Sequence, residues 1–124
     1  MMCAVAVVVV GMAVLGMVQA EQVGKYELLA SYSPVAASAA VVISGKARFS
    51  VLTPRVIRCE YASSGSFNDA ATTAFINRNT SVPHYSTARS NGVLTITTQY
   101  LKLEYVVGSP FSGATLSIAS VAGN

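Results

Sequence analysis

Hydrophobic and polar positions alternate at the start of residues 47–61, which read ARFSVLTPRVIRCEY. Phe49 and Val51 fall on one face of this run, and Arg48 and Ser50 fall on the other. A period of two residues is the signature of a pleated strand, in which successive side chains point to opposite faces. We therefore predict a strand here with one apolar face.

A second strand is predicted after a turn centred on proline. Residues 53–55, Thr-Pro-Arg, fit a tight turn, because proline presets φ at the second position of the turn. Ile57, Cys59 and Tyr61 then occupy alternate positions, which places them on one face of the returning strand. The segment is predicted to be a β-hairpin, and nothing in it is catalytic without partners from elsewhere.

Similar runs recur along the rest of the chain. Strands are expected near residues 26–30, 41–43, 84–87, 93–98, 100–107 and 116–118. Asn91 and Gly92 supply the positive φ angles that a tight primed hairpin turn needs. Residues 62–81 lose the alternation and gather Ser, Gly, Asn and Thr, which is typical of a loop. No helical period follows residue 20, so the predicted fold class is all-β, an incomplete antiparallel β-sandwich.

An unbroken apolar run, residues 4–18, precedes this region and contains no charge. Small residues at Val18 and Ala20 before the polar Glu21 fit cleavage by signal peptidase after Ala20, although a basic stretch at the start is missing. The alternative is a membrane anchor, but a spanning helix needs about 20 apolar residues. We expect a signal-peptide helix at 1–20, a lead-in at 21–39, a partial sandwich at 40–124, and secretion.

Charge excludes one class of partner. Only 10% of the residues are charged and the net charge is +3, all of it after residue 20. The eight basic residues are scattered singly, whereas a surface that follows phosphates clusters them. We therefore expect no nucleic-acid partner, a solvated basic surface, and contact with a membrane only through an uncleaved signal segment.

The candidate nucleophile has no partner in the sequence. Cys3 would leave with the signal peptide, and Cys59 lies on the apolar side of its strand, which favours a small buried hydrophobe. The single histidine, His84, lies far along the chain, so no Cys-His dyad is predicted.

The acidic residues offer no evident catalytic pair. They are Glu21, Glu27, Glu60, Asp69 and Glu104. Glu60 and Glu104 alternate outward beside Arg58 and Lys102, which favours cross-strand charge pairing. Asp69 lies in the loop, where an Asn-Asp pair is typical of turns, although it could touch a ligand. Asn79 begins the triplet Asn-Thr-Ser, a glycosylation acceptor pattern in a secreted eukaryotic protein.

Four segments together resemble the N-terminal β-sandwich, of the galactose mutarotase-like type, of glycoside hydrolase family 31, the α-glucosidase and α-xylosidase family. They are ARFSVLTPRVIRCEY, SGSFNDAATTAFINRN, SNGVLTITTQYLKLEYV and SPFSGATLSI. The likeness spans roughly residues 40–119. In that family the sandwich precedes a (β/α)8 barrel, which carries two catalytic aspartates and uses neither a metal nor an organic cofactor.

The resemblance implies a truncated module with a partner. The chain ends at Asn124 before any barrel. The family's nucleophile motif contains Trp, Asp, Met and Asn, and no segment like it is present in this sequence, which lacks tryptophan. We expect no cofactor, no catalytic residue, and no activity from this chain alone. The expected partner is a downstream barrel, whose parent enzyme cleaves α-linked glucosides or xylosides.

Two other functions stay open. A free-standing carbohydrate-binding module would stack a sugar on exposed aromatic rings, for which Tyr85 and Tyr100 are the candidates. A secreted structural or partner-binding sandwich would instead recruit another chain through an unpaired edge strand.

Overall fold

The computed structural model describes residues 32–121, and from Ser33 onward these residues form one structural unit. The predicted signal peptide, its cleavage after Ala20 and the expected strand near residues 26–30 lie outside the described residues. Within residues 32–121 the chain is all-β, as predicted, with one short 3-10 turn.

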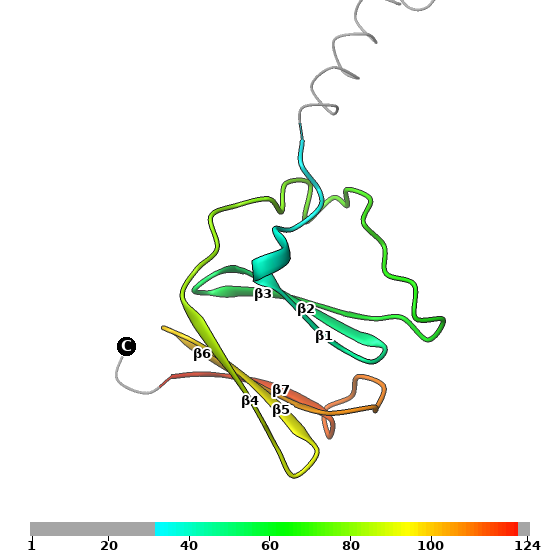
Figure 1. Ribbon diagram of the computed structural model, residues 1–124, viewed down its shortest axis with the longest axis vertical. Helices are drawn as coiled ribbons and strands as arrows, with labels where there is room; N and C mark the ends of the chain where they lie inside the picture. The colour runs from blue at the N-terminus through cyan, green and yellow to red at the C-terminus, as the bar shows by residue number, and fades with distance from the viewer. Residues whose placement is uncertain (1–31, 122–124) are drawn as a thin grey trace, which may run out of the picture. The chain divides into compact units, whose positions relative to one another are not determined.

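Seven strands form two antiparallel sheets (Figure 1). The elements are η1 (Ser38–Ala40), β1 (Val41–Ser44), β2 (Ala47–Thr53), β3 (Val56–Tyr61), β4 (Tyr85–Ser90), β5 (Val93–Thr98), β6 (Leu101–Val106) and β7 (Leu116–Ser120). The three-stranded sheet has the order β1-β2-β3, and the four-stranded sheet has the order β4-β5-β6-β7. Every strand expected within the described residues is present.

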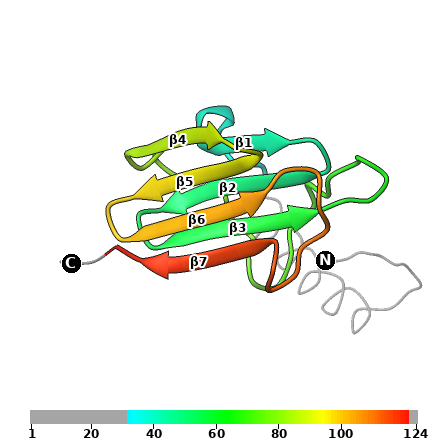
Figure 2. The ribbon, with the colours of Figure 1, turned by 90° about the horizontal axis from the view of Figure 1, so that it is seen from below.

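The core lies between the two sheets, which Figure 2 shows stacked with their strands roughly aligned. Its fully buried members are Ala47, Phe49, Val51, Leu94, Ile96, Leu103 and Tyr105. The rings of Phe49 and Tyr105 lie 5.3 Å apart between centroids and are tilted by 58°, an arrangement that aromatic pairs favour. The predicted apolar face of the first hairpin is therefore confirmed as the inner face of its sheet.

One side of the sandwich is closed by hydrogen bonds between the sheets. Arg89 of β4 donates from Nη1 to the hydroxyl of Ser44 at 3.0 Å and from Nη2 to the carbonyl of Ile43 at 3.2 Å. The hydroxyl of Tyr85 donates to the carbonyl of Ala39 at 2.7 Å. These bonds join the edge strand β4 to β1 and to the turn before it.

The opposite side is open. β3 and β7 are the end strands of their sheets and lie along the same border of the sandwich (Figure 2). Ile118 of β7 pairs with the fully buried Leu103, so it belongs to the inner face, yet 45% of it is exposed. Ile57 and Cys59 of β3 are only half-buried. The sandwich is therefore incomplete along β3 and β7.

The turns follow the sequence chemistry with one addition. Asn91 and Gly92 have φ angles of 50° and 77°, as the predicted primed turn requires. The backbone N–H of Arg55 donates to the hydroxyl of Thr53 at 3.1 Å, which fixes the turn at Pro54. A bulge between Val51 and Thr53 inserts Leu52 into β2, and Leu52 is buried as well. The two-residue alternation did not anticipate this bulge.

Candidate functional site

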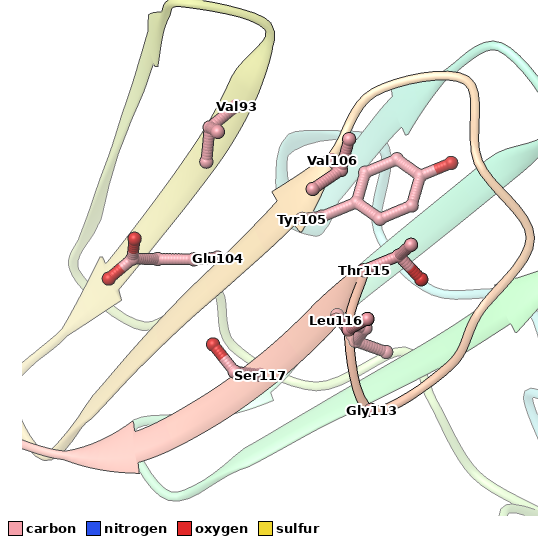
Figure 3. A pocket seen from close by; sticks show the side chains of 9 residues that line it. Val93, Glu104, Tyr105, Val106, Gly113, Thr115, Leu116 and Ser117 are labelled. Carbon is pink, nitrogen blue, oxygen red and sulfur yellow. The ribbon is translucent and has the colours of Figure 1, made fainter.

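A hollow of about 210 Å³ lies beside β5, β6 and the loop that leads into β7 (Figure 3). Glu104 is the charged residue in its lining, and its carboxylate pairs with Lys102 of the same strand at 2.7 Å, so the expected cross-strand pairing of Glu104 is wrong. The remaining lining consists of short hydroxyl and aliphatic side chains together with Tyr105, which belongs to the core. This hollow carries no free chemical group that would define a site.

A second hollow, of about 480 Å³, contains the single histidine. His84 lines it together with Pro54, Ser86 and residues of the β5–β6 turn. Cys59 does not line it, and the described residues contain no hydrogen bond between Cys59 and His84.

The outer face of the three-stranded sheet carries a more developed arrangement. Arg48 of β2 and Arg58 and Glu60 of β3 point away from the core, because they alternate with its members along their strands. Glu60 accepts from Arg48 Nη2 at 2.9 Å and from Arg58 Nη2 at 2.7 Å. The expected charge pairing of Glu60 is confirmed, and it involves a cross-strand arginine as well as a neighbour on β3.

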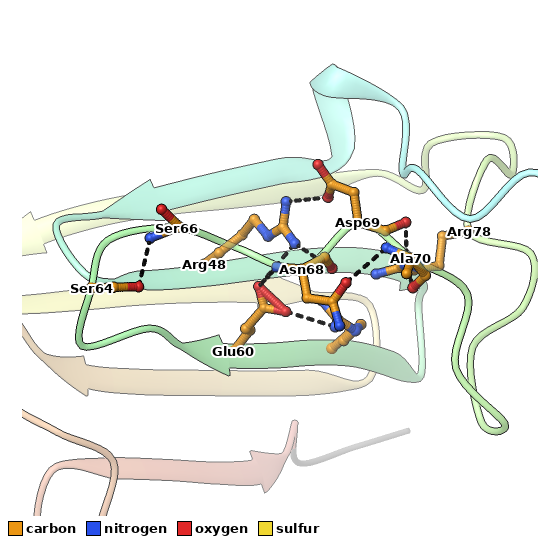
Figure 4. A network of polar contacts seen from close by, with 9 residues as sticks. Arg48, Glu60, Ser64, Ser66, Asn68, Asp69, Ala70 and Arg78 are labelled. Atoms are coloured by element: carbon orange, nitrogen blue, oxygen red, sulfur yellow. Dashed lines mark hydrogen bonds and ion pairs between the residues drawn. The ribbon is translucent and has the colours of Figure 1, made fainter.

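The loop between β3 and β4 folds over this face and adds two more charged residues (Figure 4). Asp69 accepts from Arg48 Nη1 at 2.7 Å. Arg78 donates from Nη2 to the carbonyls of Asp69 at 3.0 Å and Ala70 at 2.6 Å. We call Arg48, Arg58, Glu60, Asp69 and Arg78 the arginine cluster.

The three arginines of the cluster are largely removed from solvent. Arg78 is 2% exposed, and the side chains of Arg48 and Arg58 are 11% and 10% exposed. The ring of Phe67 covers the guanidinium of Arg48 at 4.8 Å, a cation–π contact. The interpretation of these three arginines as solvated surface residues is therefore wrong, because the loop that buries them was not placed by the sequence pattern.

The pKa values in the cluster reflect both burial and the neighbouring charges. Burial raises the pKa of the Glu60 carboxyl, but hydrogen bonds and attraction from Arg58 and Arg48 outweigh this, so the pKa falls below its usual value of 4.5. Burial, followed by repulsion from Arg58 and Arg48, lowers the pKa of Arg78.

A hollow of about 320 Å³ borders the arginine cluster. It is lined by Val35, Ala36, Ser38, Val41, Ile43, Arg48, Ser50, Asp69 and Arg78. Strand β1, the segment before it and the loop after β3 all contribute. The hollow thus combines cationic groups, one carboxylate and an aliphatic wall, and it is the candidate site that the described residues support best.

The predicted sugar-contact residues do not share one hollow. Asp69 lies at the arginine cluster and is 55% exposed in its side chain. Tyr85 packs against the core and binds Ala39 through its hydroxyl, whereas the ring of Tyr100 lies under the guanidinium of Arg55 at 3.5 Å. Asn79, the glycosylation candidate, is exposed.

Sequence reasoning missed Arg48, Arg58 and Arg78 as site residues. A signal for the first two was present, because both share the polar face of the hairpin with Glu60. Arg78 gave no signal, since only the folded loop brings it to the sheet.

Cys59 has the surroundings of a structural residue. It packs against the core, and burial raises the pKa of its thiol from 9.0 to about 11. The thiolate needed for nucleophilic attack is therefore scarce at neutral pH. The expectation of a small buried hydrophobe is met in part, because Cys59 packs against the core but is only half-buried.

Residues 32–121 contain no group of three or more His, Cys, Asp or Glu side chains arranged to hold a metal ion. Over the same residues, no helix is long and apolar enough to cross a membrane. Neither a comparison with models of known protein families nor a search of curated protein sequences gives a match for this chain.

Proposed function

We propose that this chain is a non-catalytic N-terminal β-sandwich segment of a secreted enzyme of glycoside hydrolase family 31, whose barrel cleaves α-glucosidic or α-xylosidic bonds. The observation that carries the proposal is the open border along β3 and β7, where the inner-face residue Ile118 is 45% exposed. A sandwich with this geometry is completed by further strands or by an adjoining domain. The resemblance of residues 40–119 to the family's first domain supplies the identity of that neighbour.

The acidic residues among residues 32–121 support a structural role in this proposal. Glu60 is held by two guanidinium groups, Asp69 by Arg48, and Glu104 by Lys102. Retaining glycoside hydrolysis needs two carboxyl groups about 5 to 5.5 Å apart, one as nucleophile and one as acid and base. In the proposal this pair belongs to the barrel.

Reading the coding sequence past Asn124 tests the proposal directly. We expect an in-frame segment that encodes a (β/α)8 barrel with its two aspartates. The biochemical counterpart is an assay of the purified chain with aryl α-glucosides and α-xylosides, for which we expect no hydrolysis. Turnover by the chain alone, or an open reading frame that closes without a barrel in the genome, would reject the proposal.

The open border also favours a second function, a secreted sandwich that recruits another protein chain by adding a strand to β7. Size-exclusion chromatography over a range of concentrations separates the two functions. A reversible, concentration-dependent dimer supports strand recruitment, whereas a chain that is monomeric only when fused to its barrel supports the family 31 module.

A third function, free-standing sugar binding, predicts a saturable response to malto- or xylo-oligosaccharides.

A further inference from the structure

The hollow at the arginine cluster is lined by two chemically distinct kinds of group. Arg48 and Arg78 supply guanidinium groups, and Val41 and Ile43 of β1 supply an aliphatic wall together with Val35. Ile43 is 54% exposed and Val35 is 53% exposed, although both lie beside buried charged groups. A ligand that satisfies both surfaces must be amphiphilic and small.

Charge in the arginine cluster is not balanced. Three guanidinium groups face the two carboxylates of Glu60 and Asp69, which leaves one positive charge in a region largely closed to solvent. An uncompensated buried charge is costly, and a bound monoanion would offset that cost. Burial is the largest cause of the lowered pKa of Arg78, and repulsion from Arg58 and Arg48 adds to it.

Hydrogen-bond donors in the cluster are also left without acceptors. Arg48 Nε, Arg58 Nη1 and Arg78 Nε are buried and have no acceptor among residues 32–121. Arg78 is more than nine-tenths buried and lines the hollow. Planar guanidinium groups match the two oxygens of a carboxylate, which can accept two parallel N–H bonds.

We propose that this hollow binds a small monocarboxylate with an apolar body, its carboxylate at Arg78 and Arg48 and its hydrocarbon part against Val41 and Ile43. The proposal does not depend on the family 31 assignment, because it uses only the charges, donors and aliphatic wall of the described residues. Of the predicted sugar-contact residues, the site includes Asp69 but neither Tyr85 nor Tyr100.

The test is a titration of the full chain, followed by nuclear magnetic resonance or calorimetry. Benzoate is the probe, benzamide is its neutral isostere, and acetate lacks the apolar body. We expect saturable binding of benzoate with weaker binding of acetate and none of benzamide. Binding of benzamide as tight as that of benzoate would overturn the proposal, as would binding of inorganic phosphate in place of benzoate.

Two substitutions make the test independent of folding defects. Arg78→Gln should weaken benzoate binding about tenfold or more, since it removes a charged donor. Asp69→Asn removes a competing carboxylate from an exposed position, so it should tighten benzoate binding by about two- to fivefold. Lys102→Gln removes one positive charge from the other sheet and serves as the control, with unchanged affinity.

The direction of the Asp69→Asn effect is decisive, because a variant that merely disturbs the loop would bind less tightly. A folded Asp69→Asn protein that binds benzoate no more tightly than the parent overturns the electrostatic argument. An affinity that falls equally in Lys102→Gln and Arg78→Gln would show that benzoate responds to net charge alone, which also overturns the site.

Discussion

Glu60 is the side chain on which most charged contacts of the outer sheet face converge. Two guanidinium groups and the backbone N–H of Asn68 donate to its carboxylate, and it is 15% exposed. Because its pKa lies below 4.5 in the folded protein, its pairing stabilises the fold above pH 4.5, and this contribution is lost as the pH falls through the lowered pKa.

The first prediction follows from the lowered pKa of Glu60. Glu60→Gln should lower the free energy of unfolding at pH 7 by about 2–4 kcal/mol, because it removes the carboxylate that pairs with two partly buried arginines and leaves Arg58 without an ion pair among residues 32–121. It should also flatten the loss of stability that the parent shows as the pH falls from 4.5 through the lowered pKa of Glu60. Urea unfolding at a series of pH values measures both effects. Glu104→Gln breaks an exposed pair and should cost less than about 0.5 kcal/mol at pH 7; an equal cost in both variants would contradict the role given to Glu60.

The second prediction concerns the core. Phe49 is fully buried and contacts the rings of Tyr105 and Phe111. Phe49→Ala should lower the free energy of unfolding by about 3–5 kcal/mol through lost transfer energy and a cavity. Ile43→Ala, at a residue that is 54% exposed on the adjacent strand, is the control and should cost less than about 1 kcal/mol. A denaturant midpoint that moves equally in both variants would refute this placement of the core.

At the scale of secondary-structure elements, the sheets are built from hairpins. Each two-residue turn within a sheet is set by one or two residues with special backbone preferences, and the strands on either side follow the alternation. The β4–β5 turn depends on Asn91 and Gly92, both with positive φ. A Cβ added at Gly92 meets no atom within 4 Å, so backbone conformation alone decides the cost of a side chain there.

The third prediction uses the fact that only backbone conformation, and not a steric clash, opposes a side chain at Gly92. Gly92→Ala should destabilise the protein by about 1 kcal/mol, because an alanine is strained at φ 77°. Gly113→Ala is the matched control, since Gly113 also has open space around a Cβ but does not have a positive φ. That variant should be neutral or slightly stabilising. Thermal unfolding compares the two, and equal midpoints would rule out the primed turn as the cause.

At the scale of the whole sandwich, its two borders differ. Arg89 and Tyr85 link the sheets along β1 and β4 with hydrogen bonds, whereas β3 and β7 end their sheets with half-buried or exposed inner residues. An edge strand with an exposed apolar residue is a template for association with another chain. The isolated chain is therefore expected to aggregate or to melt at low temperature.

The fourth prediction tests that expectation. Ile118→Lys places a charge on the inner face of β7, where it should reduce aggregation of the isolated chain, as inward-pointing charges on edge strands do. Ala119→Lys adds the same charge on the outer face of the same strand and is the control. Light scattering during heating measures the difference. If both lysines suppress aggregation equally, net charge and not the open border is the cause.

The strands and the core positions could be predicted from sequence, while the site could not. Alternation places Phe49, Leu103 and Tyr105 on the buried faces of their strands, because a pleated strand fixes which side chains share a face. The arginines of the cluster alternate just as regularly, yet alternation cannot distinguish a face open to water from one covered by a loop. Asp69 and Arg78 lie in a segment without periodicity, so nothing in their order along the chain places them against β2 and β3.

What the amino-acid order settles is therefore local: the strands, the primed turn at Asn91 and Gly92, and the face on which each side chain lies. Folding in three dimensions decides that Arg78 is buried, that Arg48 meets Asp69 across 21 positions of sequence, and that β3 and β7 border the same open side. The physical reason is that steric and hydrogen-bonding preferences act between near neighbours, whereas burial of charge depends on which distant segment covers it.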